Sequence, residues 1–358
     1  MTRRSESPRA QSPPTADAPR AIVIWLAIAV AAGLLAARPS LAHEGTIMTV
    51  NGAIEPGELG RTLTHEHILV DFIGAEQSGP HRWDRGQVAA VVLPHLVEAR
   101  ELGFDALIEC TPAHLGRDPL LLRELAARSG LHLLTNTGYY GARGNLFIPD
   151  AVKSLDADAL AARWVAEYES GIGDSGVRPG FIKIAVDRKP QLDPLHQRLL
   201  RAACRAHLRS GLTIACHTGP GETIWKLAEI LEDEGVAPEA FIWVHANLDQ
   251  PHNLVRAARH GLWVSIDNVR PQPKIISAIA ARLDALRAAG LLDRVLLSHD
   301  AGWYRPGEPG GGEFRDYTAL SRELIPALRA SGFSARTIDR MLVDNARRAF
   351  TIGVRKAR

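Results

Sequence analysis

Histidines and a carboxylate stand at the ends of several apolar, β-branched segments of the sequence. His65 and His67 lie two positions apart in GRTLTHEHILVDF, and residues two apart on a strand point to the same face. His217, His245 and Asp300 each end a further segment of this kind. Four imidazoles and a carboxylate form a ligand set that suits zinc, manganese, iron or cobalt. Because one catalytic metal usually takes three protein ligands and a water, four histidines predict two metal ions.

Lys183 lies inside the apolar segment GFIKIAV. A protonated amine cannot bind a metal, so this lysine has two chemical interpretations. Carbon dioxide can add to the amine to form a carbamate, whose two oxygens can bridge two cations. Alternatively, a desolvated lysine of lowered pKa forms a Schiff base, as in a metal-independent lyase. The histidines favour the carbamate, because a Schiff-base enzyme needs no cluster of imidazoles. A non-catalytic metal-binding barrel is a third hypothesis.

The segments that carry these residues predict parallel strands. Amphipathic stretches separate them, and the repeated order of helix, glycine and strand is typical of βα units. Eight such segments predict an α/β fold, the (β/α)8 TIM barrel, whose strand ends converge on one mouth. A doubly wound open sheet is the alternative, but no GxGxxG follows the first strand. The glycine- and proline-rich segment 302–314 predicts a loop over the mouth. The eight expected strands are 61–67, 104–110, 131–138, 180–186, 212–218, 241–246, 262–268 and 294–300.

The first 42 residues differ in composition from the rest and predict a signal peptide. The apolar run 21–37 is followed by Ser40 and Ala42, small residues at the positions that a signal peptidase needs. An uncleaved membrane anchor is the alternative, and the Arg3-Arg4 pair leaves twin-arginine export open. We therefore expect an exported protein, periplasmic or secreted, without stable membrane association after cleavage. Residues 43–358 are expected to form a single catalytic domain.

Composition argues against a nucleic-acid partner and against a disulfide framework. Lys plus Arg total 42 against 40 for Asp plus Glu, so no basic excess is available to neutralise the phosphates of a nucleic acid. Cys110, Cys204 and Cys216 are too few and too scattered for a disulfide framework, although export leads to an oxidising compartment. We expect buried free thiols.

The same segments resemble the phosphotriesterase family of the amidohydrolase superfamily, over nearly the whole of the expected catalytic domain. The resemblance begins with VNGAIEPGELGRTLTHEH and includes GFIKIAV with its lysine. The other matching segments are ECTPAHLGRD, NTGYYGA, ACHTGPGE, WVHAN, VSIDNV, LSHDAGW and VDNARRAF. It implies a binuclear metal-dependent hydrolase and a homodimer.

The resemblance also implies a role for each candidate ligand. His65, His67 and Asp300 would hold the more buried metal, and His217 and His245 the more exposed one. A carboxylated Lys183 and a hydroxide would bridge the two ions. Zn²⁺ is the first expectation, with Mn²⁺, Co²⁺ or Fe²⁺ as alternatives.

The expected reaction is attack of the metal-activated hydroxide on a small carboxylic ester or a lactone, with Asp300 accepting its proton. Hydrolysis of organophosphate triesters, the aryldialkylphosphatase reaction, is the alternative. Asn268 stands where organophosphate hydrolases have a histidine and related lactonases an arginine, although Arg270 is near. Leu248, or a shifted Asp249, stands where the former have the aspartate of a proton relay.

Three residues are expected to contact the substrate. Tyr140 occupies the place where lactonases have a tyrosine, so its hydroxyl could bond a ring oxygen, or its ring could simply form the pocket wall. Asn268 and Trp303 are the other two, and Trp303 and Tyr304 would line the leaving-group side. His299, the neighbour of Asp300, should point away from the site.

Overall fold

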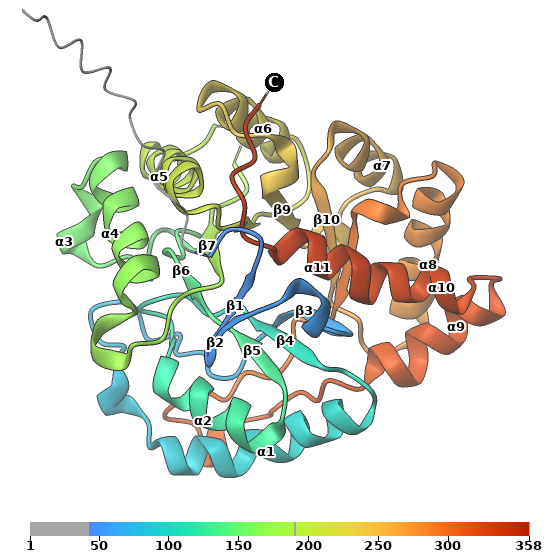
Figure 1. The fold of residues 1–358 in the computed structure, drawn as a ribbon, viewed down its shortest axis with the longest axis horizontal. Coiled ribbons are helices and arrows are strands. Elements are labelled where there is room, and N and C mark those ends of the chain that lie inside the picture. Colours follow the sequence, from blue (N-terminus) through green and yellow to red (C-terminus); the bar gives the residue numbers. More distant parts are fainter. Residues whose placement is uncertain (1–42, 190, 358) are drawn as a thin grey trace, which may run out of the picture. The chain divides into compact units, whose positions relative to one another are not determined.

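The computed structural model describes residues 43–189 and 191–357 (Figure 1). The signal peptide predicted for residues 1–42, and the membrane anchor that was its alternative, lie outside these described residues and stay predictions. Within the described ranges, no helix is both long and apolar enough to cross a bilayer.

Short parallel strands form the centre of the described chain, in two sheets with the orders β3-β4-β5 and β6-β7-β8-β9-β10-β11. The third barrel strand is interrupted at Thr135, which separates β5 from β6. The two ends of the strand series meet, because the Thr64 hydroxyl donates to Leu297 O at 3.1 Å and His65 N donates to Ser298 Oγ at 2.9 Å. This closure excludes the open sheet and confirms the predicted barrel. The strands are β3 (Thr62–Glu66), β4 (Ala106–Glu109), β5 (His132–Leu134), β6 (Asn136–Thr137), β7 (Phe181–Ala185), β8 (Ile214–His217), β9 (Phe241–Val244), β10 (Trp263–Asp267) and β11 (Val295–Ser298).

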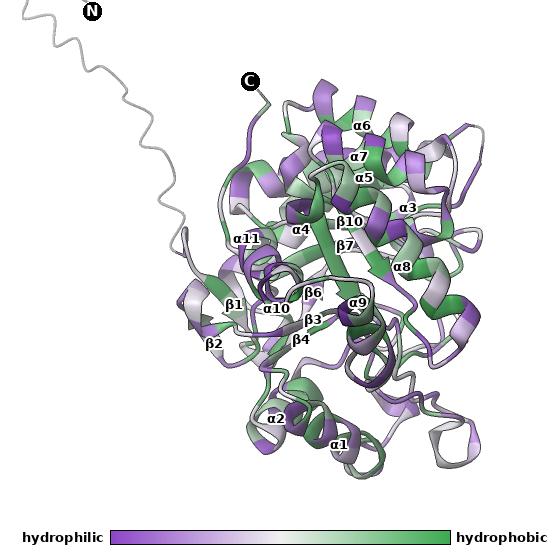
Figure 2. Cartoon of the chain, turned by 90° about the vertical axis from the view of Figure 1, so that its right-hand side faces the viewer, coloured by the Kyte–Doolittle hydropathy of each residue, from purple (hydrophilic) through white to green (hydrophobic). Residues whose placement is uncertain are grey.

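Helices surround the strands (Figure 1). Several begin at an aspartate whose carboxylate accepts a backbone N–H of the first turn, as at Asp84, Asp118 and Asp156. The strands are mostly apolar, whereas polar residues mark the outer helix faces (Figure 2). The helices are α1 (Arg85–Glu101), α2 (Pro119–Ser129), α3 (Asp150–Lys153), α4 (Ala157–Ser170), α5 (Pro194–Ser210), α6 (Thr223–Asp233), α7 (Pro251–His260), α8 (Pro273–Ala288), α9 (Ile325–Ala330), α10 (Ala335–Asp339) and α11 (Asn345–Phe350).

One end of the barrel is covered by the hairpin of β1 (Ile47–Thr49) and β2 (Gly52–Ile54) together with α11 (Figure 1). Residues of α11 share an apolar cluster with inward-facing strand residues, and the rings of Phe350 and Phe181 lie 5.6 Å apart. The three cysteines are free and buried, as predicted. Because apolar packing fills this end, a polar site belongs at the opposite mouth, where the strands terminate.

Candidate metal centre

All six predicted ligands line one cavity of about 240 Å³ at the carboxyl ends of the strands. His65 lies on β3, Lys183 on β7 and His217 at the end of β8. His67, His245 and Asp300 lie one or two residues beyond the ends of β3, β9 and β11, respectively. The barrel thus gathers side chains that are separated by more than two hundred positions in the sequence.

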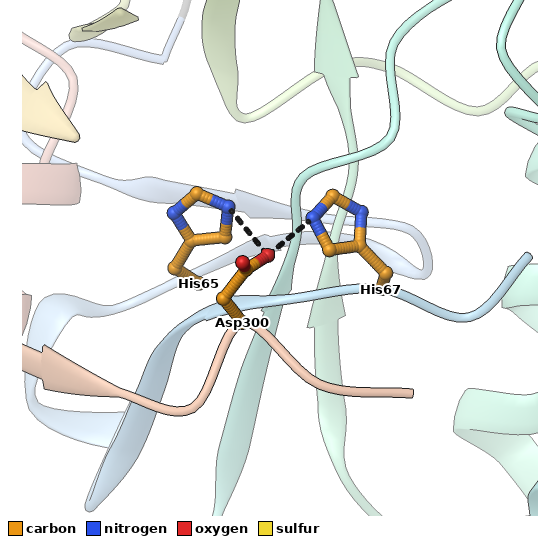
Figure 3. Close-up of side chains that lie close together, drawn as sticks. All are labelled: His65, His67 and Asp300. Carbon is orange, nitrogen blue, oxygen red and sulfur yellow. Dashed lines mark ion pairs between the residues drawn. The ribbon is translucent and has the colours of Figure 1, made fainter. Parts of the chain in front are cut away.

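His65, His67 and Asp300 form the tightest group in this cavity. The Asp300 carboxylate lies between the two imidazoles, 3.7 Å from His65 Nε2 and 3.1 Å from His67 Nε2 (Figure 3). Their potential ligand atoms all lie within 4.8 Å of one another, a spacing that could hold a metal ion. Burial would raise the pKa of Asp300, but the hydrogen bond from His67 and the nearby imidazoles lower it, so the carboxylate is ionised.

The other two histidines face each other across the same cavity. His245 Nε2 lies 2.8 Å from His217 Nδ1, and the Tyr140 hydroxyl lies 3.1 Å from the same His217 nitrogen. Lys183 Nζ lies 3.4 Å from His65 Nε2, and its side chain is almost fully buried. Lys183 therefore contacts the first group from a position deep in the cavity that both groups share.

Asp267, at the end of β10, contacts one histidine from each group, and the sequence interpretation missed it. Its carboxylate lies 2.6 Å from His245 Nδ1 and 3.3 Å from His65 Nδ1. The backbone N–H of His245 and the Ser265 hydroxyl also donate to it, at 3.0 and 2.8 Å. The sequence did contain a signal for it, because Asp267 is a carboxylate at the end of an apolar strand, the same kind of position that the candidate ligands occupy. Such an outer partner fixes the orientation of a ligating imidazole.

Three imidazoles share one orientation, with Nδ1 turned to an outer partner and Nε2 turned to the cavity. For His65 and His245 the partner is Asp267, and for His67 it is the Thr111 hydroxyl, 2.8 Å from Nδ1. Each Nε2 thus faces the cavity, where a metal ion would take the place of its present contact with Asp300, His217 or Lys183, and this is the orientation of ligating histidines. The chemistry of the donor set therefore fits bound cations.

The protonation of the histidines fits the same interpretation. Burial lowers the pKa of His65 to about 4 and also lowers the pKa of His67. Burial, with the neighbouring His245, holds the pKa of His217 well below its usual value. Burial acts in the same direction on His245, but the Asp267 carboxylate outweighs it and raises the pKa of that imidazole. A metal ligand must be unprotonated, and three of the four are neutral at pH 7 without any metal.

Glu66, the residue between His65 and His67, binds the loop that carries Asp300. Its Oε1 accepts from His299 Nδ1 and Ser298 Oγ, both at 2.7 Å, and its Oε2 accepts from Ala301 N at 2.8 Å. His299 Nε2 accepts the Leu320 N–H at 2.9 Å, so its proton is on Nδ1. His299 is thus bonded away from the cavity, as predicted.

Two of the three residues predicted to contact the substrate lie at the cavity, and the third does not. Tyr140 and Trp303 line the cavity, whereas Asn268 does not, and its Oδ1 accepts from Arg270 Nε at 2.7 Å. A substrate contact of Asn268 stays a prediction. The Asp249 carboxylate accepts the backbone N–H of Gly221 at 2.7 Å. It therefore ties two loops together.

Loops supply cavity residues that the sequence interpretation missed. These residues follow the first, second and third barrel strands and form the side of the cavity away from the strand ends. They are Val70, Phe72, Leu115 and Arg143. No periodic pattern marks such positions, because the path of a loop depends on contacts made by the folded chain.

Comparison with known proteins agrees with this geometry. The chain is 30% identical over 297 residues to the phosphotriesterase homology protein of Escherichia coli (strain K12), covering 81% of this chain and 98% of that protein. It is 24% identical over 311 residues to an aryldialkylphosphatase of Saccharolobus solfataricus, covering 84% and 97%. An N-acetyltaurine hydrolase of Mus musculus is 24% identical over 350 residues, covering 86% and 98%.

Solved structures give the same result. A double mutant of organophosphorus hydrolase from Deinococcus radiodurans superimposes with a TM-score of 0.77 at 28% identity, covering 86% of this chain and 98% of that one. The model of the phosphotriesterase family matches residues 45–350, a range that contains all six predicted ligands. The chain therefore belongs to the phosphotriesterase family, and its relatives include hydrolases named aryldialkylphosphatase and N-acetyltaurine hydrolase.

Proposed function

We propose that the protein is a binuclear metal-dependent hydrolase that cleaves a carboxylic ester or a lactone. The observation that carries the proposal is the convergence of four imidazoles, a lysine and a carboxylate on one cavity at the strand ends. In the reaction, water adds to the acyl carbon and the bond to the alcohol oxygen breaks. An ester then gives an acid and an alcohol, and a lactone gives a hydroxy acid.

Two sets of side chains would hold the cations. His65, His67 and Asp300 form one set, and His217 and His245 form the other. When bound, two divalent cations such as Zn²⁺ would lower the pKa of a bound water and polarise the acyl oxygen of the substrate. Asp267 and Thr111 would keep the ring nitrogens of the first set and of His245 aimed at the ions.

Lys183 would bridge the two sets as a carbamate. The ammonium first loses one proton, the neutral amine adds to carbon dioxide, and a second proton is released, so that a cationic side chain becomes an anion with two oxygens. The environment supports this change: the side chain is 1% exposed, and no carboxylate lies within ion-pairing distance of Nζ among the described residues. A buried unpaired ammonium beside two cations is strongly unfavourable, whereas an anion there is favourable.

Two further side chains would act on the substrate and the attacking water. The low pKa of Asp300 means that it is ionised and can take the proton of that water in the reaction. Burial raises the pKa of Tyr140 well above its usual value, so its hydroxyl keeps its proton and can donate to an ester oxygen. The same hydroxyl lies 3.1 Å from His217 Nδ1, at the edge of the ligand set.

Hydrolysis of phosphotriesters is the second candidate, because relatives and structural neighbours carry the names aryldialkylphosphatase and organophosphorus hydrolase. The relatives named N-acetyltaurine hydrolase add an amide bond to the range of the family. Asn268 weighs against the phosphotriester, because an amide cannot relay a proton from Asp300 as an imidazole could. The same water attack would serve all three bonds, so the assay must include each.

The test combines metal analysis with a substrate panel of lactones, aryl esters, an N-acyl amide and an aryl dialkyl phosphate. We expect about two metal equivalents per chain and chelator-sensitive turnover of an ester or lactone. His217→Ala should lower kcat/KM by about a hundredfold or more, because the ligands act as a unit. His260→Ala, which removes an exposed histidine of α7, is the matched control. If the metal-bound protein gave only background turnover on every ester and lactone, the proposal would be wrong. An adduct trapped by borohydride in the presence of chelator would instead favour the Schiff-base lyase.

A further inference from the structure

Arg143 presents a guanidinium to the cavity that holds the candidate metal centre, without a carboxylate partner. It lines that cavity together with the six predicted ligands. None of the described carboxylates makes an ion pair with it, and it forms no side-chain hydrogen bond within the described chain. Arg143 is exposed to solvent at the cavity, and its five N–H donors, which no described protein group uses, match a carboxylate or another oxyanion.

The loop around Arg143 is fixed although the guanidinium is free. The backbone N–H groups of Arg143 and Gly144 donate to the two oxygens of Asp187, at 2.7 and 3.0 Å. Tyr140 and Phe147 pair as an antiparallel bridge across the base of the loop. Asp187 thus positions the loop through its two backbone hydrogen bonds, and among the described residues it forms no ion pair with the Arg143 guanidinium.

The backbone of Arg143 also indicates that its side chain matters. Its φ is 60°, in the left-handed region that favours glycine. An arginine at such a position carries a conformational cost that a glycine would avoid, and strain of this kind collects at ligand-binding sites. Its guanidinium lies 5.1 Å from the ring of Phe72 and 5.7 Å from that of Phe147, which hold the charge beside the cavity without cancelling it.

From these contacts we infer that the natural substrate carries an oxyanion, a carboxylate or a sulfonate, that pairs with Arg143 while its ester group lies at the metal centre. This inference rests on the proposed function and specifies the substrate class. A cavity of about 240 Å³ has both groups in its wall, so the anion and the scissile bond belong to one small molecule. A neutral phosphotriester or an unsubstituted lactone would leave the arginine unpaired.

The test uses two aryl esters whose distal carboxylate is either free or methylated, 4-nitrophenyl hydrogen adipate and its methyl ester. With metal-replete protein we expect Arg143→Met to raise KM for the anionic ester about tenfold to a hundredfold and to change the neutral one by less than about twofold. Arg143→Lys should restore part of the difference. The control is Arg256→Met, which removes an arginine stacked 3.7 Å over Trp225, on α7 and outside the cavity. Equal losses on both esters, or a wild-type preference for the neutral ester, would overturn the inference.

A binding measurement separates this inference from the proposed function. Calorimetric titration with propanesulfonate, a weak metal ligand, and with the neutral methyl propyl sulfone needs no turnover. Arg143-dependent binding of the sulfonate alone, in a protein that hydrolyses neither ester, would leave the anion site standing and remove the ester-hydrolase proposal. Hydrolysis of both esters, with sulfonate binding absent or unchanged in Arg143→Met, would support the ester-hydrolase proposal and remove the anion site.

Discussion

Asp267 contacts the candidate centre although it does not line the cavity itself. It contacts His65 and His245, one histidine from each group, and burial opposes its charge. The pKa of Asp267 is nevertheless held well below its usual value, chiefly by His245. A buried anion that binds two imidazoles fixes which nitrogen of each ring is free.

We expect Asp267→Asn to lower metal affinity about tenfold to a hundredfold, because the amide lacks the charge that pairs with His65 and strengthens the hydrogen bond to His245. Competition with a chromophoric chelator measures that affinity directly. Asp249→Asn serves as the matched control, since that carboxylate binds loop N–H groups outside the cavity. An affinity equal to that of the wild type would show that Asp267 only stabilises the fold.

Between elements, His207 joins α5 to the C-terminal tail. Its Nδ1 donates to Leu212 O at 2.8 Å, and its Nε2 accepts the Arg355 N–H at 2.9 Å. Both ring nitrogens are thus used by a neutral imidazole. Burial lowers the pKa of His207 to about 4, against an ordinary value of 6.5 in the unfolded chain.

This shift makes stability depend on pH. Between about pH 6.5 and pH 4 the unfolded chain binds a proton at His207 that the folded chain does not, so stability falls as pH falls through this window. Its contribution to the loss from about pH 7 to about pH 5 is about 2 kcal/mol.

Urea unfolding of the wild type and His207→Gln at both pH values measures the difference. The glutamine variant should start less stable and lose less stability on acidification, because it lacks the His207 titration. The loss that remains comes from other buried histidines, which titrate in both proteins. Parallel pH profiles for the two proteins would contradict the assignment of this loss to His207.

At the scale of the molecule, metal binding and folding should be coupled. The candidate ligands come from five barrel strands or the residues just after them, so they are assembled only in the folded state. Ligands that bind the folded state alone stabilise it by about 4 kcal/mol at a thousandfold excess over Kd.

We therefore expect removal of metal by a chelator to lower Tm by several degrees, and added Zn²⁺ to restore it. Differential scanning calorimetry of both forms checks this expectation. His217→Ala should show a smaller response than the wild type, and His260→Ala the full response. Identical Tm values with and without metal, in a protein shown to bind it, would refute the coupling.

The sequence predicted the strands and the candidate ligands best where a chemically distinctive residue stands at the end of an apolar, β-branched segment. The eight alternating strand and helix segments predicted the barrel, and the histidines at the strand ends predicted a site at its mouth, because a parallel barrel aligns its strand ends. The break at Thr135 was not predictable, since its flanking residues are as strand-like as their neighbours. Neither was Arg143, whose position depends on Asp187, a residue more than forty positions away. Local patterns fix strands, and long-range contacts fix loops.

The cavity has two kinds of wall, and this division bears on how the molecule can change. The candidate ligands sit on or directly after strands, where backbones pass so closely that a side chain at Gly138 would collide with Lys183 O, and one at Gly302 with His67 O. The facing side, with Phe72, Leu115 and Arg143, belongs to loops that surround the mouth. Substitutions in the loops can consequently change substrate preference during evolution while the candidate metal ligands stay the same. Proteins with one barrel can in this way come to hydrolyse unrelated compounds.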